Sequence, residues 1–93
     1  MQSTATPIRN PIVVLREEFD DWAVLFNPDT AEAVGINPIA VAVWKQIDDK
    51  RSLEQITTWV REHYSVIPDS VEQDIASLMD DFVQKGFVGL TVE

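Results

Sequence analysis

The sequence has no cysteine and a single histidine among its 93 residues. Without cysteine the chain has no disulfide, no thiolate metal ligand and no thiol nucleophile. His63 alone cannot make a multi-histidine site, and without a nearby nucleophile it is better explained as a surface or capping histidine than as a base. We therefore expect no metal and no cofactor, and the lack of cysteine fits a reducing cytoplasm.

Long apolar runs are also missing. None approaches the roughly 20 residues that a transmembrane helix needs. Met1–Asn10 has one arginine and no apolar stretch, so we expect neither a signal peptide nor a membrane anchor there. These features predict a soluble, cytoplasmic protein with no membrane partner.

Basic residues are scarce, with 7 Lys and Arg against 16 Asp and Glu and a net charge of -9. A field of this sign repels the phosphate backbone of nucleic acids and attracts basic partners. We therefore expect no nucleic-acid partner.

The polar, aperiodic segment Met1–Asn10 predicts a flexible N-terminal arm, and residues 11–93 are enough for one domain with a modest core. Apolar runs at 12–15 and 22–26 predict two strands, separated by a turn at Asp20-Asp21. A third, weaker strand is expected over Ala31–Ile36. Its small residues and Gly35 mark it as an edge that another backbone can approach.

Helix boundaries are better marked than strand boundaries. Asn37 before Pro38 predicts a capped helix that runs to about Asp48. Ser52 with Gln55 three residues later predicts a capping box, and the second helix is expected to end near residue 65.

The third helix is expected to begin at Asp69 or Ser70, with Gln73 reaching back to the cap, and to end at Lys85-Gly86. A short final strand is predicted over 87–92. Trp22, Trp44 and Trp59 are expected to anchor the core rather than to form a binding cage.

Three strands followed by three helices predict an α+β, winged-helix-like fold, in which a three-stranded antiparallel sheet precedes a three-helix bundle. DNA binding would require the third helix to enter a groove. That helix region has one lysine, Lys85, against five acids: Asp69, Glu72, Asp74, Asp80 and Asp81. An acidic winged-helix transcriptional regulator and a generic protein–protein adaptor stay open as alternatives.

Several segments together resemble the PqqD family, whose members are also called RiPP recognition elements. They are Trp22-Ala-Val-Leu-Phe26, Val34-Gly35-Ile36-Asn37, the helix with Trp44 and Ile47-Asp48, Ser52-Leu53-Glu54-Gln55-Ile56, and Leu78 to Val88 with Lys85-Gly86-Phe87. Stand-alone copies in small peptide-modification cassettes, including the SynChlorMet type, look most similar.

The resemblance implies a non-catalytic, PqqD-like domain over residues 11–93. Such a peptide chaperone binds the leader region of a ribosomally synthesised precursor peptide and presents it to a modifying enzyme, often a radical SAM protein. In the family, the leader adds as a strand to the edge of the third strand and lays side chains against the third helix.

Transferred to this sequence, the resemblance implies a peptide-binding site with no catalytic and no metal-binding residue. Its members are Ala31, Glu32, Ala33, Val34, Gly35, Ile36, Val71, Asp74, Ile75, Leu78, Asp81, Phe82 and Lys85. The same pattern also fits a plainer interpretation, in which Ile75, Leu78 and Phe82 belong to the core and the acids to a solvated flank. An exposed edge strand leaves the oligomeric state open between a monomer and an edge-paired or domain-swapped dimer.

Overall fold

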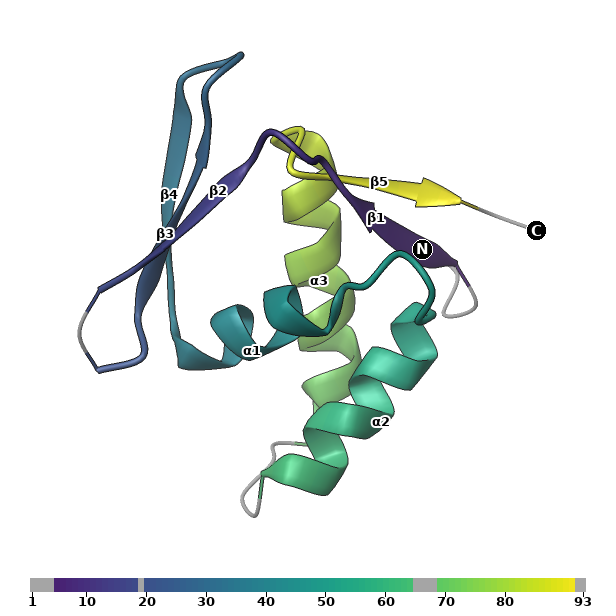
Figure 1. Ribbon diagram of the computed structural model, residues 1–93. Coiled ribbons are helices and arrows are strands. Elements are labelled where there is room, and N and C mark those ends of the chain that lie inside the picture. The colour runs from purple at the N-terminus through teal and green to yellow at the C-terminus, as the bar shows by residue number, and fades with distance from the viewer. Residues whose placement is uncertain (1–4, 19, 65–68, 92–93) are drawn as a thin grey trace.

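The computed structural model describes residues 5–18, 20–64 and 69–91 (Figure 1). A three-stranded antiparallel sheet of order β2-β3-β4 precedes three helices, and a separate two-stranded sheet joins β1 to β5. The elements are β1 (Thr6–Arg9), β2 (Val14–Glu17), β3 (Ala23–Asn27), β4 (Glu32–Ile36), α1 (Pro38–Gln46), α2 (Leu53–His63), α3 (Val71–Gln84) and β5 (Val88–Thr91). The predicted α+β class and the order of its main elements are confirmed.

The predicted flexible arm is wrong for the part that the structure describes. Thr6–Arg9 forms β1, which pairs antiparallel with β5 from Thr6↔Thr91 to Arg9↔Val88. The backbone carbonyl of Ala5 also accepts a hydrogen bond from the N–H of Leu53 at 2.9 Å. This short polar segment carries no strand pattern of its own, because its order comes from a partner at the other end of the chain. The other residues of the predicted arm, 1–4, lie outside the described part.

The first strand of the three-stranded sheet begins two residues later than the sequence predicts. The side chain of Asn10 accepts a hydrogen bond from the N–H of Ile12 at 3.2 Å, and its carbonyl accepts one from the N–H of Val13 at 3.1 Å. These bonds hold Ile12 and Val13 in a turn, so β2 starts at Val14. The turn before β3 is confirmed, with Asp20 and Asp21 at φ 57° and 64°.

The first two helices begin where the sequence predicts. The side chain of Asn37 accepts a hydrogen bond from the N–H of Ala40 at 2.9 Å, with Pro38 at the first helical position. Both hydrogen bonds of the Ser52–Gln55 capping box are present. α1 ends at Gln46, two residues before its predicted end, and α2 ends at His63; residue 65 lies outside the described part.

The predicted capping box of α3 is wrong. Ser70 occupies the cap position but its side chain makes no capping hydrogen bond. The hydroxyl of Ser70 instead donates to Asp74 Oδ2 at 2.9 Å. The C-terminal stop is confirmed, since Gly86 has the left-handed φ of 77° that favours glycine.

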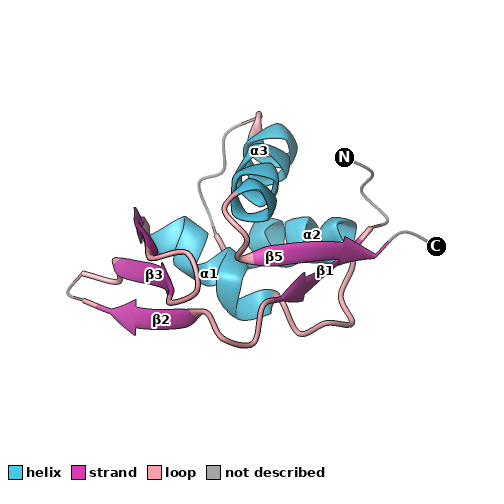
Figure 2. Cartoon of the chain, turned by 90° about the horizontal axis from the view of Figure 1, so that it is seen from above, coloured by secondary structure: helices cyan, strands magenta, loops and turns pink. Residues whose placement is uncertain are grey.

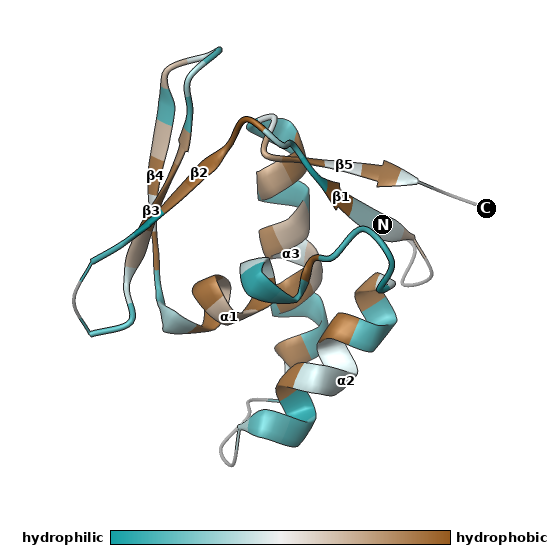
Figure 3. Cartoon of the chain, viewed as in Figure 1, coloured by the Kyte–Doolittle hydropathy of each residue, from teal (hydrophilic) through white to brown (hydrophobic). Residues whose placement is uncertain are grey.

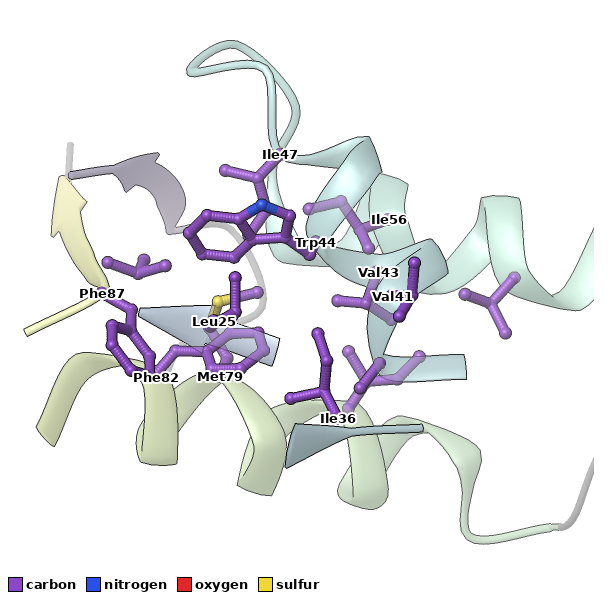
Figure 4. Close-up of a cluster of buried hydrophobic side chains, with 14 of the residues drawn as sticks. Leu25, Ile36, Val41, Val43, Trp44, Ile47, Ile56, Met79, Phe82 and Phe87 are labelled. Carbon is purple, nitrogen blue, oxygen red and sulfur yellow. The ribbon is translucent and has the colours of Figure 1, made fainter. Parts of the chain in front are cut away.

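The helices lie on one side of the three-stranded sheet, as Figures 1 and 2 show together. Between them is a core to which Leu25 and Ile36 contribute from the sheet, Trp44 from α1 and Met79 and Phe82 from α3 (Figure 4). All five side chains are at most 5% exposed. The rings of Trp44 and Phe82 meet edge to face, with centroids 5.6 Å apart, which is a favoured aromatic geometry.

Only one of the three tryptophans is a fully buried core anchor. Trp44 is 2% exposed, whereas Trp22 is 51% exposed. Trp59 is half-buried and stacks on His63 with ring centroids 4.2 Å apart. The exposed His63 also hydrogen-bonds the carbonyl of Trp59 through Nδ1 at 2.8 Å, which is a capping contact near the helix end.

Gly86 forms a polar junction that ties the end of α3 to two distant segments. Its carbonyl accepts hydrogen bonds from the amides of Asn10 at 3.0 Å and Asn27 at 3.4 Å. Asn27 is 2% exposed, so its bonds are protected from water. The junction therefore fixes β3 against the C-terminus of α3.

Within the described ranges, no helix has both the length and the apolar character needed to cross a bilayer.

Candidate functional site

The backbone of β4 forms one edge of the three-stranded sheet, because among the described strands it pairs with β3 alone. The N–H of Glu18 donates to the carbonyl of Trp22 at 2.8 Å, so the backbone groups of Trp22 point toward β2. Backbone direction alternates along an antiparallel strand. Three residues later, the backbone groups of Leu25 therefore point toward β4, where its partner is Val34.

The same alternation identifies which residues of β4 face the open edge. Since the N–H and C=O of Val34 point inward to β3, those of Ala33 and Gly35 point outward. Among the described residues, none hydrogen-bonds these outward groups. Two donors and two acceptors are thus available to an incoming strand.

Side-chain direction in β4 alternates as well. Val34 and Ile36 lie on the helix-facing side and pack against the core, whereas Ala33 and Gly35 lie on the outer face. A Cβ built on Gly35 has no atom within 4 Å. The absence of a side chain at Gly35 therefore frees space on the outer face rather than at the edge, and backbone access to the edge does not depend on this glycine.

The predicted α3 residues divide into two groups. Val71, Ile75 and Phe82 are core side chains, with exposed fractions of 6%, 2% and 1%. They share one core with Ile36 of β4, as the close-up in Figure 4 shows for Ile36 and Phe82. The structure thus brings β4 and α3 together, but these three side chains offer little surface to a ligand.

The second group forms a row on one flank of α3, consisting of Asp74, Leu78, Asp81 and Lys85. At 100° per residue, this row lies on the flank opposite Glu72, which contacts Arg61 of α2 at 2.7 Å. Figure 2 shows α2 and the three-stranded sheet on different sides of α3. Leu78 is half-buried at the margin of the core, and Asp74 is exposed.

The charges of this row are partly satisfied within α3. Lys85 Nζ lies 2.6 Å from both carboxylate oxygens of Asp81. Asp74 accepts the hydroxyl of Ser70 but has no cation within salt-bridge distance among the described residues. Asp74 is therefore the acid of the row that retains an uncompensated charge.

The remaining predicted positions lie at the two ends of β4. Ala31 precedes the strand and has a φ of 61°, so it belongs to the turn rather than to the edge. Glu32 is exposed and pairs with Asn27.

No group of three or more His, Asp or Glu side chains in the described part of the chain is placed to hold a metal ion. One carboxylate is specifically stabilised elsewhere. Asp48 Oδ1 accepts hydrogen bonds from the N–H groups of Arg51 at 2.8 Å and Lys50 at 3.0 Å, which lowers the pKa of Asp48. These bonds order the link between α1 and α2, so Asp48 has a structural role.

The sequence matches the family described as "Coenzyme PQQ synthesis protein D (PqqD)" over residues 23–88, which is more than two thirds of the chain. The match runs from β3 to the first residue of β5 and so includes β4 and α3. The chain therefore belongs to the PqqD family. No curated protein matches its sequence.

Two solved structures share the fold. TbiB1 in complex with the TbiA(beta) leader peptide has a TM-score of 0.75 and 21% identity, covering 92% of this chain and 99% of that one. Lasso peptide synthetase B1 complexed with the leader peptide has a TM-score of 0.73 and 20% identity, covering 90% and 98%.

Proposed function

We propose that this chain binds the leader region of a ribosomally synthesised precursor peptide by strand addition to β4. It acts as a non-catalytic chaperone that presents the peptide to a modifying enzyme, which is either a radical SAM protein or a peptide-modifying enzyme of another class. The observation that carries the proposal is the open edge of β4, where the backbone groups of Ala33 and Gly35 point away from the sheet.

Membership of the PqqD family and the leader peptides bound to the two structural neighbours support this function. A strand added to β4 gains backbone hydrogen bonds, which give affinity without fixing the peptide sequence. Its alternate side chains point toward the helices, where Val34 and Leu78 form the half-buried apolar margin of the core. Selection would come from these inward contacts.

DNA binding receives no support from the surface of α3. Glu72, Asp74 and Asp80 are all exposed on this helix, and Lys85 is neutralised by Asp81. Phosphates brought to this surface meet like charge.

The test is binding of a synthetic leader, taken from the short precursor peptide that we expect to be encoded beside this gene. Fluorescence anisotropy would compare wild type with Ala33→Pro and, as a matched control on the other edge, Glu17→Pro. Proline at Ala33 removes an outward N–H and places a ring where the incoming strand pairs. We expect the affinity to fall at least about tenfold for Ala33→Pro and to stay within about twofold for Glu17→Pro.

A second arm leaves the protein unchanged and alters the leader. N-methylation at every second residue removes donors from one side of the added strand only. One methylation pattern should abolish binding and the alternate pattern should preserve most of it. Equal binding by both patterns, or loss of affinity in Glu17→Pro but not in Ala33→Pro, would contradict addition to β4. Sedimentation of wild type would detect an edge-paired dimer as the competing occupant, and Ala33→Pro should lose that dimer.

A further inference from the structure

The outer face of the three-stranded sheet carries a row of apolar side chains that the helices do not cover. Val14 of β2 is paired with Phe26 of β3, so both point to the same face. Val24 of β3 continues this face at two-residue spacing, and so does Trp22, which directly precedes the strand and accepts a hydrogen bond from the N–H of Glu18. Leu25, between Phe26 and Val24, is 0% exposed and points to the core.

These side chains form a continuous surface, which we call the outer patch and define as Val14, Trp22, Val24 and Phe26. Val14 is 53%, Trp22 51% and Phe26 39% exposed, while Val24 is half-buried. Single exposed apolar residues are ordinary on protein surfaces. An aligned group that includes two aromatics on one sheet face is typical of an interaction site, and Trp is frequent among the residues that dominate binding energy.

The margin of the outer patch is acidic. Glu18, Asp20 and Asp21 are exposed where β2 turns into β3, and this turn is hydrophilic in Figure 3. Glu18 and Asp20 line a shallow depression beside Trp22. Arg16, paired with Val24 on the same face, is partly neutralised by Glu18, with Nε and Oε1 3.7 Å apart.

This combination of an apolar centre and an acidic margin selects among occupants. Anionic lipid and nucleic acid are repelled, and a second copy of this chain would bring two acidic margins together. A protein surface with apolar side chains surrounded by Lys and Arg is complementary in both respects.

The outer patch is continuous with the proposed leader edge. Ala33 is paired with Phe26 and Gly35 with Val24, so both small residues lie between the patch and the open side of β4. A leader added to β4 therefore lies directly beside the patch. We propose that the outer patch docks the peptide-modifying enzyme, through an apolar surface with a basic margin, while β4 holds the leader. This proposal rests on the proposed function and identifies the surface that joins chaperone to enzyme.

Site-specific photo-cross-linking in cells tests the occupant. A benzophenone amino acid replaces Val14 in the outer patch or, as the control, exposed Thr58 on α2. We expect the position-14 probe to cross-link the peptide-modifying enzyme, identified by mass spectrometry, and the position-58 probe not to. A position-14 cross-link to a second copy of this chain or to another class of protein, or no cross-link at all, would overturn the proposal.

Affinity measurements separate this proposal from the proposed function. Trp22→Ser is compared with Val83→Ser, which removes a 37% exposed apolar side chain from α3 instead. Against the modifying enzyme encoded with this chain, we expect Trp22→Ser to lose about tenfold or more in affinity and Val83→Ser to stay within about twofold. Wild-type affinity should also fall as salt rises.

Leader affinity, measured for the same proteins, should respond in the opposite way to enzyme affinity. Trp22→Ser should bind leader as wild type does, whereas Ala33→Pro should lose leader and keep direct affinity for the enzyme. A wild-type protein that binds the enzyme but does not bind the leader would refute the proposed function alone. Unchanged enzyme affinity in Trp22→Ser would refute docking on the outer patch, whatever the leader does.

Discussion

The two edges of the three-stranded sheet, β2 and β4, have opposite character. The free edge of β2 exposes the backbone of Leu15 and Glu17, and it is flanked by charged side chains that include Arg16. Glu17 is also bound to Lys45 of α1, with Oε1 2.6 Å from Nζ. Charged side chains are a common means of protecting an edge from pairing.

β4 lacks this protection over most of its length. After Glu32 its residues are small or apolar, and the two that face the open edge, Ala33 and Gly35, carry a methyl group and a hydrogen atom. One sheet therefore has a protected edge and an available one. The difference predicts that an added strand selects β4, and this choice depends on side chains rather than on the pairing pattern alone.

Proline scanning of the two edges should give the largest effect. Proline at Val34 or Arg16 removes an N–H that bonds to β3, whereas proline at Ala33 or Glu17 removes one that points to solvent. We expect the first pair to lose about 2–3 kcal/mol more free energy of unfolding than the second pair in urea titrations. Equal losses within each strand would show that the assigned backbone directions are wrong.

This alternation marks a limit of prediction from sequence. The residues of β4 identify an edge strand, but Ala33 and Val34 differ in backbone direction only once the pairing with β3 is known. The order of Thr6–Arg9 depends on β5, whose residues are 85 positions away at the outer pair. Local pattern cannot reveal a strand whose partner is so distant.

Side chains of α3 show the same limit. Its helical spacing predicts one sector containing both Ile75 and Leu78, yet Ile75 is 2% exposed and Leu78 is half-buried at the margin. Periodicity identifies the apolar face, whereas the position of α2 decides which flank stays open. Trp22 is misjudged for a related reason, because it directly precedes β3, and the alternation of that strand places it outside the core with Val24 and Phe26.

The turns that lead into β3 and β4 also differ. Ala31 has a φ of 61° and Asp21 one of 64°, and aspartate tolerates this region better than alanine. Ala31→Gly should therefore raise the free energy of unfolding by about 1 kcal/mol, and Asp21→Gly should raise it less. Thermal and urea denaturation measure both. A destabilised Ala31→Gly protein would mean that conformational relief at the start of β4 is outweighed by the added chain entropy.

Gly35 tests whether the available edge needs glycine. Its outer face is open, so Gly35→Thr should fit and should stabilise the strand by about 0.5–1 kcal/mol. Leader affinity should change by less than about twofold, because the new side chain points away from the pairing direction. A large loss of leader affinity in a stabilised Gly35→Thr protein would instead show that the bound peptide extends over the outer face.

The smallest expected effect concerns charge beside β4. Within the described part of the chain, Asp74 is the acid of the α3 row that has no cation within salt-bridge distance, so it should attract a basic leader residue, with exposed pairs contributing about 0.2–1 kcal/mol. Asp74→Asn should therefore weaken leader binding by less than about fivefold at low salt. The matched control is Asp80→Asn, which changes net charge equally but lies about 120° away around the helix. At low salt, a general effect of net charge would weaken both variants similarly, whereas local pairing weakens Asp74→Asn alone. At physiological salt, charges separated by more than about 8 Å are screened. Equal affinities for the two variants would remove Asp74 from the site and leave selection of β4 to its backbone and apolar margin.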